Sequence, residues 1–272
     1  MPTRAFYTSP RALTGFVNPI SFEECRAKYA EHVVLEKRDQ VVLCRLHTQG
    51  ESCRFSPQWY HAMSMLWRDL GADPTNEVLI VTGTGEAWMS GSDPHGSEGF
   101  ELLTHSYDHY AQAALHLMEG YLYNLDIPTI AAFNGPAPHS EFGLLSDIVI
   151  CSEESTFGDG HFPGGYVPGD GQTYAIAGRI GLGRASYLAY TGKQIDAAEA
   201  LRLGLVNEVL TADRLVDRAW ELAEAMMQQP RTVRRFTHSL LSRYWKDFLH
   251  THLGYGLALE MMSLHVEGPQ ST

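Results

Sequence analysis

The chain has 272 residues, of which 44% are hydrophobic and 19% are charged, as in an ordinary globular protein. Its formal net charge of −12 argues against nucleic acid and anionic membranes as partners, because both are bound through clustered lysine and arginine. No apolar run reaches the roughly 18 residues that a membrane-spanning helix needs.

The four cysteines form neither a C-x-x-C pair nor a zinc-binding pattern with histidine; they are Cys25, Cys44, Cys53 and Cys151. We therefore expect reduced thiols and a cytoplasmic location. The start of the chain lacks the apolar stretch and cleavage site of a secretory signal, and we expect residues 1–30 to form an N-terminal arm.

Strand and helix patterns alternate through the first half of the chain. Residues 32–48 are apolar on both sides of a charged tip, which predicts a β-hairpin. Residues 56–73 open on a serine and a proline and repeat apolar residues at helical spacing, which predicts a helix. Short apolar runs predict buried strands at 77–85, 127–135 and 146–158.

Beyond a ribbon rich in glycine and proline at 158–171, the pattern is mostly helical. Helices are predicted at 172–190, 196–203, 213–228 and 230–265, with a small edge element at 204–210. Strands that alternate with helices indicate an α/β fold with parallel pairing. We expect one core over residues 31–210 and a C-terminal helical region over 211–272.

Four segments carry motifs in a fixed order. They are WMSGSD (88–93), IPTIAAFNGPA (127–137), SDIVICSEESTFG (146–158) and the stretch from VPGDGQ to GLVNEV (167–209). Together they resemble the crotonase (enoyl-CoA hydratase/isomerase) superfamily over roughly residues 30–268. The resemblance implies a crotonase-type ββα spiral core, and a C-terminal helical region through which subunits form a homotrimer or a dimer of trimers.

The departures from that family's patterns concern charged and polar positions. His47 stands where the family has the arginine of N-R-P, and His139 lies among replacements for the glycines of G-G-G-x-E. His161 falls on the second catalytic glutamate of hydratases, and Asp170 on a position that is usually small. Glu141 still aligns with the first hydratase glutamate.

These substitutions resemble one branch of the superfamily, the 6-oxocamphor hydrolase and related β-diketone hydrolases. The segments GDGHFPGGYVPGDG (158–171) and GLALE (256–260) are similar to that branch. Its members need no coenzyme A and use water to cleave the carbon–carbon bond between two carbonyls. The resemblance implies a cofactor-free retro-Claisen hydrolysis of a cyclic or bicyclic β-diketone to a keto acid.

The chemistry of such a reaction suits a histidine paired with a carboxylate. A base must activate water and an acid must protonate the departing enolate, and imidazole can do both near neutral pH. His161 and Asp170 are nine residues apart, so they can meet only if the ribbon between them doubles back. Spacing alone favours a surface loop with solvated side chains, whereas the ungapped alignment with a catalytic position favours the pair.

Three further residues are catalytic candidates. His139 is expected to donate to a substrate carbonyl in place of lost backbone amides, or else to be a solvated loop histidine. Glu260, a lone acid on an apolar helical stretch, is expected by resemblance to hold the water or an imidazole, the alternative being an exposed acid. His47, at a strand end, is a catalytic candidate or an ordinary rim histidine.

Substrate-binding candidates are aromatic residues that could line an apolar pocket, with Ser92 as a backbone donor. They are Trp88, Phe100, Phe162 and Tyr166, and any of them could be ordinary core. His105, His109 and His116 share a predicted helical stretch without a third ligand at a telling distance, so we expect no metal.

Two other functions are compatible with the sequence. A coenzyme A-dependent hydratase, isomerase or thioester hydrolase would use Glu141 and His161, although the family arginine and the triple glycine are missing. A non-catalytic binding or assembly module is the third possibility. Random substitution after loss of activity, however, would rarely place two histidines and an aspartate at such positions.

Overall fold

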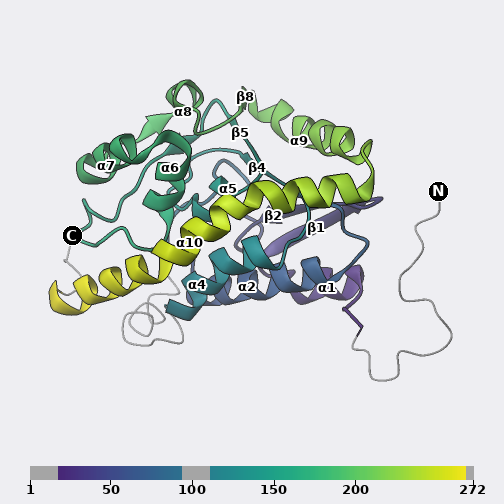
Figure 1. The fold of residues 1–272 in the computed structure, drawn as a ribbon, viewed down its shortest axis with the longest axis horizontal. Coiled ribbons are helices and arrows are strands. Elements are labelled where there is room, and N and C mark those ends of the chain that lie inside the picture. Colours follow the sequence, from purple (N-terminus) through teal and green to yellow (C-terminus); the bar gives the residue numbers. More distant parts are fainter. Residues whose placement is uncertain (1–17, 94–110, 268–272) are drawn as a thin grey trace.

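A six-stranded sheet forms the centre of the protein in a computed structural model that describes residues 18–93 and 111–267 (Figure 1). Strands β1 and β2 are antiparallel, and all other neighbours in the order β1-β2-β3-β4-β5-β8 are parallel. The strands of this sheet are β1 (Val33–Arg38), β2 (Val41–Leu46), β3 (Val78–Gly83), β4 (Thr129–Phe133), β5 (Ile148–Ser152) and β8 (Glu208–Leu210). The predicted α/β class is confirmed.

The helices and a second small sheet surround this centre. Strands β6 (Thr156–Phe157) and β7 (Ile195–Asp196) pair antiparallel. The helices are α1 (Phe22–Lys28), α2 (Pro57–Ala72), α4 (Ala111–Tyr123), α5 (Glu141–Leu144), α6 (Gln172–Ile180), α7 (Leu182–Thr191), α8 (Ala197–Leu203), α9 (Ala212–Met227) and α10 (Arg231–Glu267).

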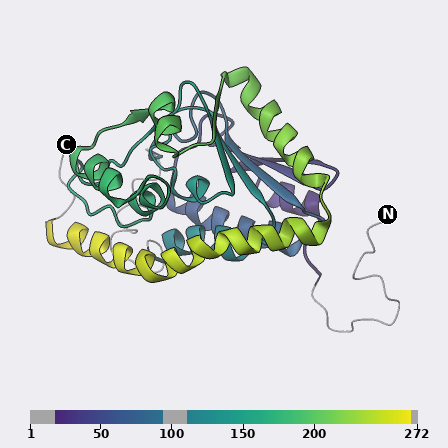
Figure 2. The same ribbon diagram turned by 45° about the horizontal axis from the view of Figure 1, so that its top comes forward.

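Helices cover both faces of the sheet (Figures 1 and 2). Helix α9 packs Leu215, Ala219 and Trp220 against one face. Helices α2 and α4 supply buried aromatic and aliphatic side chains to the core on the other face. Because both faces are covered, β3 and β4 are buried at every residue, as parallel strands usually are.

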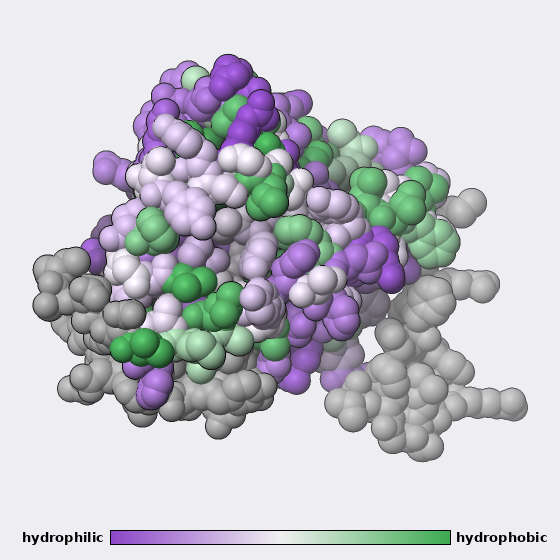
Figure 3. Space-filling view, turned by 60° about the vertical axis from the view of Figure 1, so that its left-hand side comes forward, coloured by the Kyte–Doolittle hydropathy of each residue, from purple (hydrophilic) through white to green (hydrophobic). Residues whose placement is uncertain are grey.

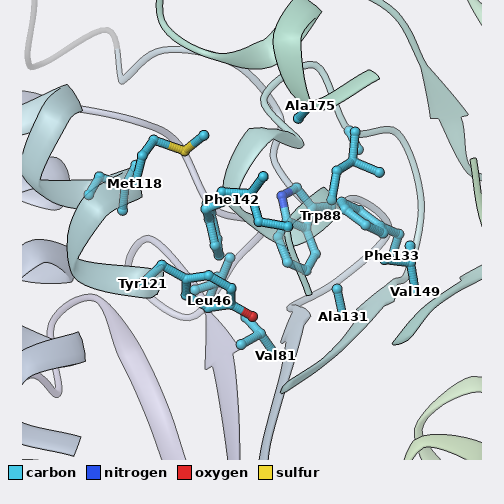
Figure 4. Packing of buried hydrophobic residues seen from close by; sticks show 14 of the residues in the cluster. Leu46, Val81, Trp88, Met118, Tyr121, Ala131, Phe133, Phe142, Val149 and Ala175 are labelled. Carbon is cyan, nitrogen blue, oxygen red and sulfur yellow. The ribbon is translucent and has the colours of Figure 1, made fainter. Parts of the chain in front are cut away.

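An aromatic cluster fills the core near the carboxyl ends of β3 and β4 (Figure 4). The ring centroids of Trp88 and Phe133 are 4.2 Å apart, and those of Trp88 and Phe142 are 5.4 Å apart. Gly143 lies directly against these rings, since a Cβ there would come within 2.6 Å of Phe133. The loops that follow β3 and β4 therefore rest on a closely packed base.

Most elements lie where the sequence predicts them, with three differences. The strand expected at 146–158 is two strands, β5 and β6, separated by a turn at Glu153 and Glu154. The helix expected at 172–190 breaks at Gly181, whose φ of 88° ends α6 before α7 begins. Helix α1, which the sequence patterns do not predict, is a capped helix that buries Cys25 in the core.

Helix α10 crosses the molecule from the sheet to the ribbon at 158–171 (Figure 1). At its first turns Arg231, Arg234 and Arg235 all pair with the buried carboxylate of Glu77. Near its other end Gly256 lies against Gly169 of the ribbon, so closely that a Cβ on Gly256 would come within 2.6 Å of the Gly169 carbonyl oxygen. The predicted C-terminal helical region is therefore packed onto the core at both ends.

Apolar side chains remain exposed on the helices. Large exposed residues on α10 and α7 include Phe236, Leu240, Tyr255, Leu182 and Tyr190. On the face drawn in Figure 3, hydrophobic residues lie in several separate groups among hydrophilic ones. Assembly into trimers stays a prediction. Among the described residues, no helix combines the length and hydrophobicity required to cross a bilayer.

The tight contact between Gly256 and Gly169 predicts that an added side chain at Gly256 lowers the stability of the fold. Gly254, on the same helix, serves as the control. In Gly256→Ala the new Cβ must push against the Gly169 carbonyl and the Tyr174 ring, and we expect about 1–3 kcal/mol of destabilisation. Gly254 is exposed with nothing near its Cβ direction, so Gly254→Ala should stabilise by roughly 0.5–1 kcal/mol through helix propensity. Urea unfolding of both variants measures the difference, and equal stabilities would contradict the tight contact.

Candidate active site

The candidate site lies where the parallel strands end. His139 lies six residues beyond the end of β4, and the ribbon at 158–171 follows β6 of the small second sheet. The carboxyl ends of parallel strands meet at one edge of a sheet, which is where ligands of open α/β proteins usually bind. Loops from distant parts of the sequence are therefore gathered at this edge.

The ribbon doubles back on itself. The N–H of Tyr166 donates to the His161 carbonyl at 2.9 Å, and that of Gly164 donates to the Gly160 carbonyl at 3.0 Å. These bonds close a tight turn, and the chain then returns to the start of α6. As a result, Asp170 Oδ2 lies 3.5 Å from His161 Nε2, the juxtaposition that the sequence analysis requires.

The His161 ring has carboxyl groups on both sides. Its Nδ1 lies 2.7 Å from Asp159 Oδ1. Its Nε2 faces Asp170 and also lies 3.7 Å from Glu260 Oε1, which α10 brings into the site. The His161 side chain is 15% exposed and the three acids are nearly inaccessible, so these charges interact in a largely enclosed space.

His139 approaches Asp170 from the loop after β4. Its Nδ1 is 3.5 Å from both Glu141 Oε1 and Asp170 Oδ2. Its ring packs edge-on against Phe55 at 4.3 Å and against His161 at 5.9 Å between centroids. Asp170 therefore lies between the two imidazoles.

A buried glutamine joins the loop of His139 to the ribbon of His161. The Gln172 amide accepts from the Ser140 N–H at 2.9 Å and donates to the Gly158 carbonyl at 2.8 Å. On the other side of His139, the Trp88 indole N–H donates to the His139 carbonyl at 2.9 Å. The backbone around His139 is thus held by hydrogen bonds to two buried side chains.

The surroundings shift the protonation equilibria of the cluster. Burial opposes the charge of His139, but Glu141 and Asp170 outweigh it and raise the pKa of the imidazole to about 10. The pKa of His161 is also raised, because Asp170 and Asp159 outweigh burial and repulsion from His139. Burial raises the pKa of Glu260 to about 8, against a hydrogen bond from the Gly169 N–H.

Asp170 shows the opposite shift. Burial alone would raise its pKa, but the two imidazoles and the Gln172 N–H lower it well below its usual range. At neutral pH the site thus holds a protonated His139, an ionised Asp170 and a neutral Glu260. Groups with such separated proton affinities are typical of acid–base sites.

The other predicted residues lie elsewhere. His47 is buried, its Nδ1 accepts from the Gly50 N–H at 3.1 Å, and it lines a cavity of about 620 Å³ whose lining contains none of the cluster's acids or histidines. Trp88 is fully buried in the aromatic core, so it supports His139 and does not face a pocket. Phe162 is 48% exposed and packs on Tyr190.

Two other substrate-binding candidates make backbone hydrogen bonds. Tyr166 closes the ribbon turn with its N–H, and the exposed Ser92 accepts from Arg54 with its carbonyl oxygen at 3.4 Å. Phe100, His105 and His109 lie outside the described residues. His116 lies on α4 and belongs to neither metal-compatible set within the described part of the chain.

Three residues in the site were not predicted from sequence. Asp159 and Gln172 contribute the contacts described above, and Tyr60 of α2 is close enough for its pKa to be raised, by burial and by the nearby acids. A signal existed for Gln172, because the family pattern P-G-x-G-G has glycine there. Asp159 precedes His161 by two residues and resembles an ordinary turn residue.

Two sets of side chains bring possible metal-ligand atoms within 4.8 Å of one another. They are His139, Glu141 and Asp170, and His161, Asp170 and Glu260. In each set an imidazole nitrogen already faces the carboxylates, so a cation and a protonated histidine would compete for one place.

Comparison with known proteins places the chain in a family. Residues 36–263 match the family described as enoyl-CoA hydratase/isomerase. The chain belongs to this family. A hydroxycinnamoyl-CoA hydratase-lyase of Pseudomonas fluorescens is 30% identical over 211 residues, covering 75% of each protein. An enoyl-CoA hydratase/isomerase structure from Mycobacterium paratuberculosis is similar with a TM-score of 0.79 and 26% identity, over 88% of this chain and 95% of that one.

One similar structure within the same fold carries a different activity in its name. It is a β-diketone hydrolase from the cyanobacterium Anabaena sp. PCC 7120, bound to (S)-3-oxocyclohexyl acetic acid. Its TM-score is 0.83 at 32% identity, and the match covers 88% of this chain and 96% of that one. The predicted crotonase-type fold and superfamily are confirmed.

The charge of His139 can be tested through Glu141, the acid that raises its pKa most. In Glu141→Gln we expect the pKa of His139 to fall from about 10 by roughly one unit or more, measured by NMR titration of the imidazole. A pKa raised above the unfolded value stabilises the fold fully below about pH 6.5, and this stabilisation is lost as pH rises through about 10. The stability advantage of the wild type over the variant should therefore shrink over that range.

The exposed Glu154 offers a control, since Glu154→Gln should leave the titration of His139 unchanged. A wild-type midpoint near the ordinary histidine value would show that the carboxylates do not hold His139 in its charged form.

Proposed function

We propose that this protein is a coenzyme-independent hydrolase that cleaves a carbon–carbon bond of a cyclic or bicyclic β-diketone by a retro-Claisen reaction. The observation that supports this most is the pair of largely buried imidazoles on either side of Asp170. One imidazole is a hydrogen-bond donor held in its charged form, and the other turns Nε2 toward buried acids. The similarity to a β-diketone hydrolase gives independent support.

The reaction begins with water beside His161. Its Nε2 takes a proton as the water oxygen adds to one carbonyl carbon of the diketone. Glu260, neutral below about pH 8, can hold this water from the other side. Because the pKa of His161 is raised, the ring becomes an effective base only above the ordinary titration range of histidine.

His139 stabilises the negative charge that develops on the attacked carbonyl oxygen. A preorganised charged donor in an enclosed site is worth roughly 3–4 kcal/mol of barrier. The bond between the attacked carbon and the carbon shared by the two carbonyls then breaks, and its electron pair passes to the second carbonyl as an enolate. The proton taken by His161 returns to the enolate carbon, so diketone and water give one keto acid.

Substrate turnover tests this proposal. We expect formation of a keto acid, measured by chromatography and mass spectrometry, when the protein is mixed with a panel of cyclic 1,3-diketones that includes the bicyclic diketone whose hydrolysis would give 3-oxocyclohexyl acetic acid. His161→Gln should lower kcat by about 10²–10⁴-fold, because it removes the base. His250→Gln, on an exposed position of α10, should retain full activity. The proposal fails if folded protein consumes no member of a broad panel.

A coenzyme A-dependent reaction is the second candidate, because relatives such as the hydroxycinnamoyl-CoA hydratase-lyase are named for such substrates. Glu141, which aligns with the first hydratase glutamate, is buried beside His139. Against this candidate, His47 occupies the position of the family arginine and the chain is strongly acidic.

Isothermal titration calorimetry with acetyl-CoA and a long-chain acyl-CoA separates the two candidates. We expect no heat of binding at micromolar protein concentration, because the chain is strongly acidic and the arginines at the start of α10 are already paired with Glu77. Submicromolar binding of either ligand would favour the second candidate.

A further inference from the structure

We propose that Asp159 is the positioning residue of the site: it fixes which nitrogen of His161 carries the proton, so that Nε2 is left as the base. The sequence points to Asp170 as the carboxylate partner of His161, but the two acids lie on opposite sides of the ring. Asp159 faces Nδ1 at 2.7 Å, whereas Asp170 faces Nε2 at 3.5 Å.

Two of the contacts of Asp159 are with hydrogen-bond donors. Its Oδ1 accepts from the His161 backbone N–H at 3.0 Å, and its Oδ2 accepts from the Thr173 hydroxyl at 2.5 Å. Since a carboxylate offers only lone pairs, the remaining contact requires a proton on His161 Nδ1. A neutral ring then has its lone pair on Nε2, on the side of Asp170, Glu260 and His139.

The same contacts fix the orientation of the ring. Asp159 Oδ1 contacts both the backbone N–H and the ring Nδ1 of His161. The two contacts together restrict the side-chain torsions of His161. Thr173 lies in the first turn of α6 and holds the other oxygen. The Asp159 side chain is 1% exposed, so it can influence substrate only through His161.

This arrangement assigns separate tasks to the two aspartates. Asp159 selects the tautomer and direction of one histidine. Asp170 holds the two imidazoles on either side of the reacting space. The inference rests on the proposed function only where it concerns turnover, because the tautomer of His161 can be observed in the protein without substrate.

Nitrogen-15 NMR of the His161 imidazole, assigned with His161→Gln, tests the proposal directly. In the wild type at high pH we expect a neutral ring that is protonated on Nδ1. Asp159→Asn should lower the pKa of His161 by roughly one unit or more, because it removes the negative charge hydrogen-bonded to the ring. A neutral wild-type ring protonated on Nε2, or an unchanged pKa in the variant, would overturn the proposal.

Three variants serve as comparisons. Asp170→Asn should also lower the pKa but leave the neutral proton on Nδ1, because Asp170 lies on the other side of the ring. The exposed Asp217→Asn should change neither property. Thr173→Val removes only the hydroxyl that orients Asp159, and should give a smaller decrease in pKa even if Asp159→Asn does not fold.

Kinetics with a cleaved diketone complete the test. Asp159→Asn should lower kcat by about 10²-fold or more with little change in KM, since the buried side chain does not contact substrate. If the variant cleaves the diketone as fast as the wild type, the inference fails and the proposed function stands. If the ring responds as expected but wild-type protein cleaves no diketone, the proposed function fails and the inference stands.

Discussion

Electrostatic balance in a confined space determines the rest of the site. Four acids converge on two imidazoles, and all of them are almost inaccessible to water; the acids are Glu141, Asp159, Asp170 and Glu260. Leaving a buried carboxylate without a partner costs several kcal/mol, so the acids require the charge of the histidines. The same balance holds His139 in its protonated form and leaves Glu260 neutral, so the need to bury these groups stably already separates them into donors and acceptors.

The fold was largely predictable because its signals are local. The hairpin at 32–48 is indicated by its charged tip, and the helix at 56–73 by its N-cap. Both form as predicted. The single strand predicted at 146–158 is two strands in the structure, because an apolar run does not show where a turn interrupts the pairing. Helix α1 was missed, although Ser21 and Glu24 form a capping box in the structure.

The site was predictable only in part, for a related reason. His139, His161, Asp170 and Glu260 were singled out by their positions in family motifs, and the structure brings all four together. Asp159 has no such signal, since its importance depends on how a side chain two residues away is turned. Trp88 is fully buried in the structure, and the sequence left both alternatives open because an aromatic ring beside a loop looks the same whether it contacts a ligand or the core.

Helix α10 is held to the core by contacts at two distant points. Its first arginines form ion pairs with Glu77 beside the sheet. Glu260 lies 29 residues beyond Arg231, which is about 44 Å along a straight helix. Over such a span, a tilt of one degree at the arginine end displaces the far end by about 0.8 Å, enough to lengthen a hydrogen bond into a gap. The close contact between Gly256 and Gly169 prevents such a tilt. The placement of one carboxyl group at the site is thereby tied to ion pairs on the opposite side of the molecule, and damage to either support would be felt at the other.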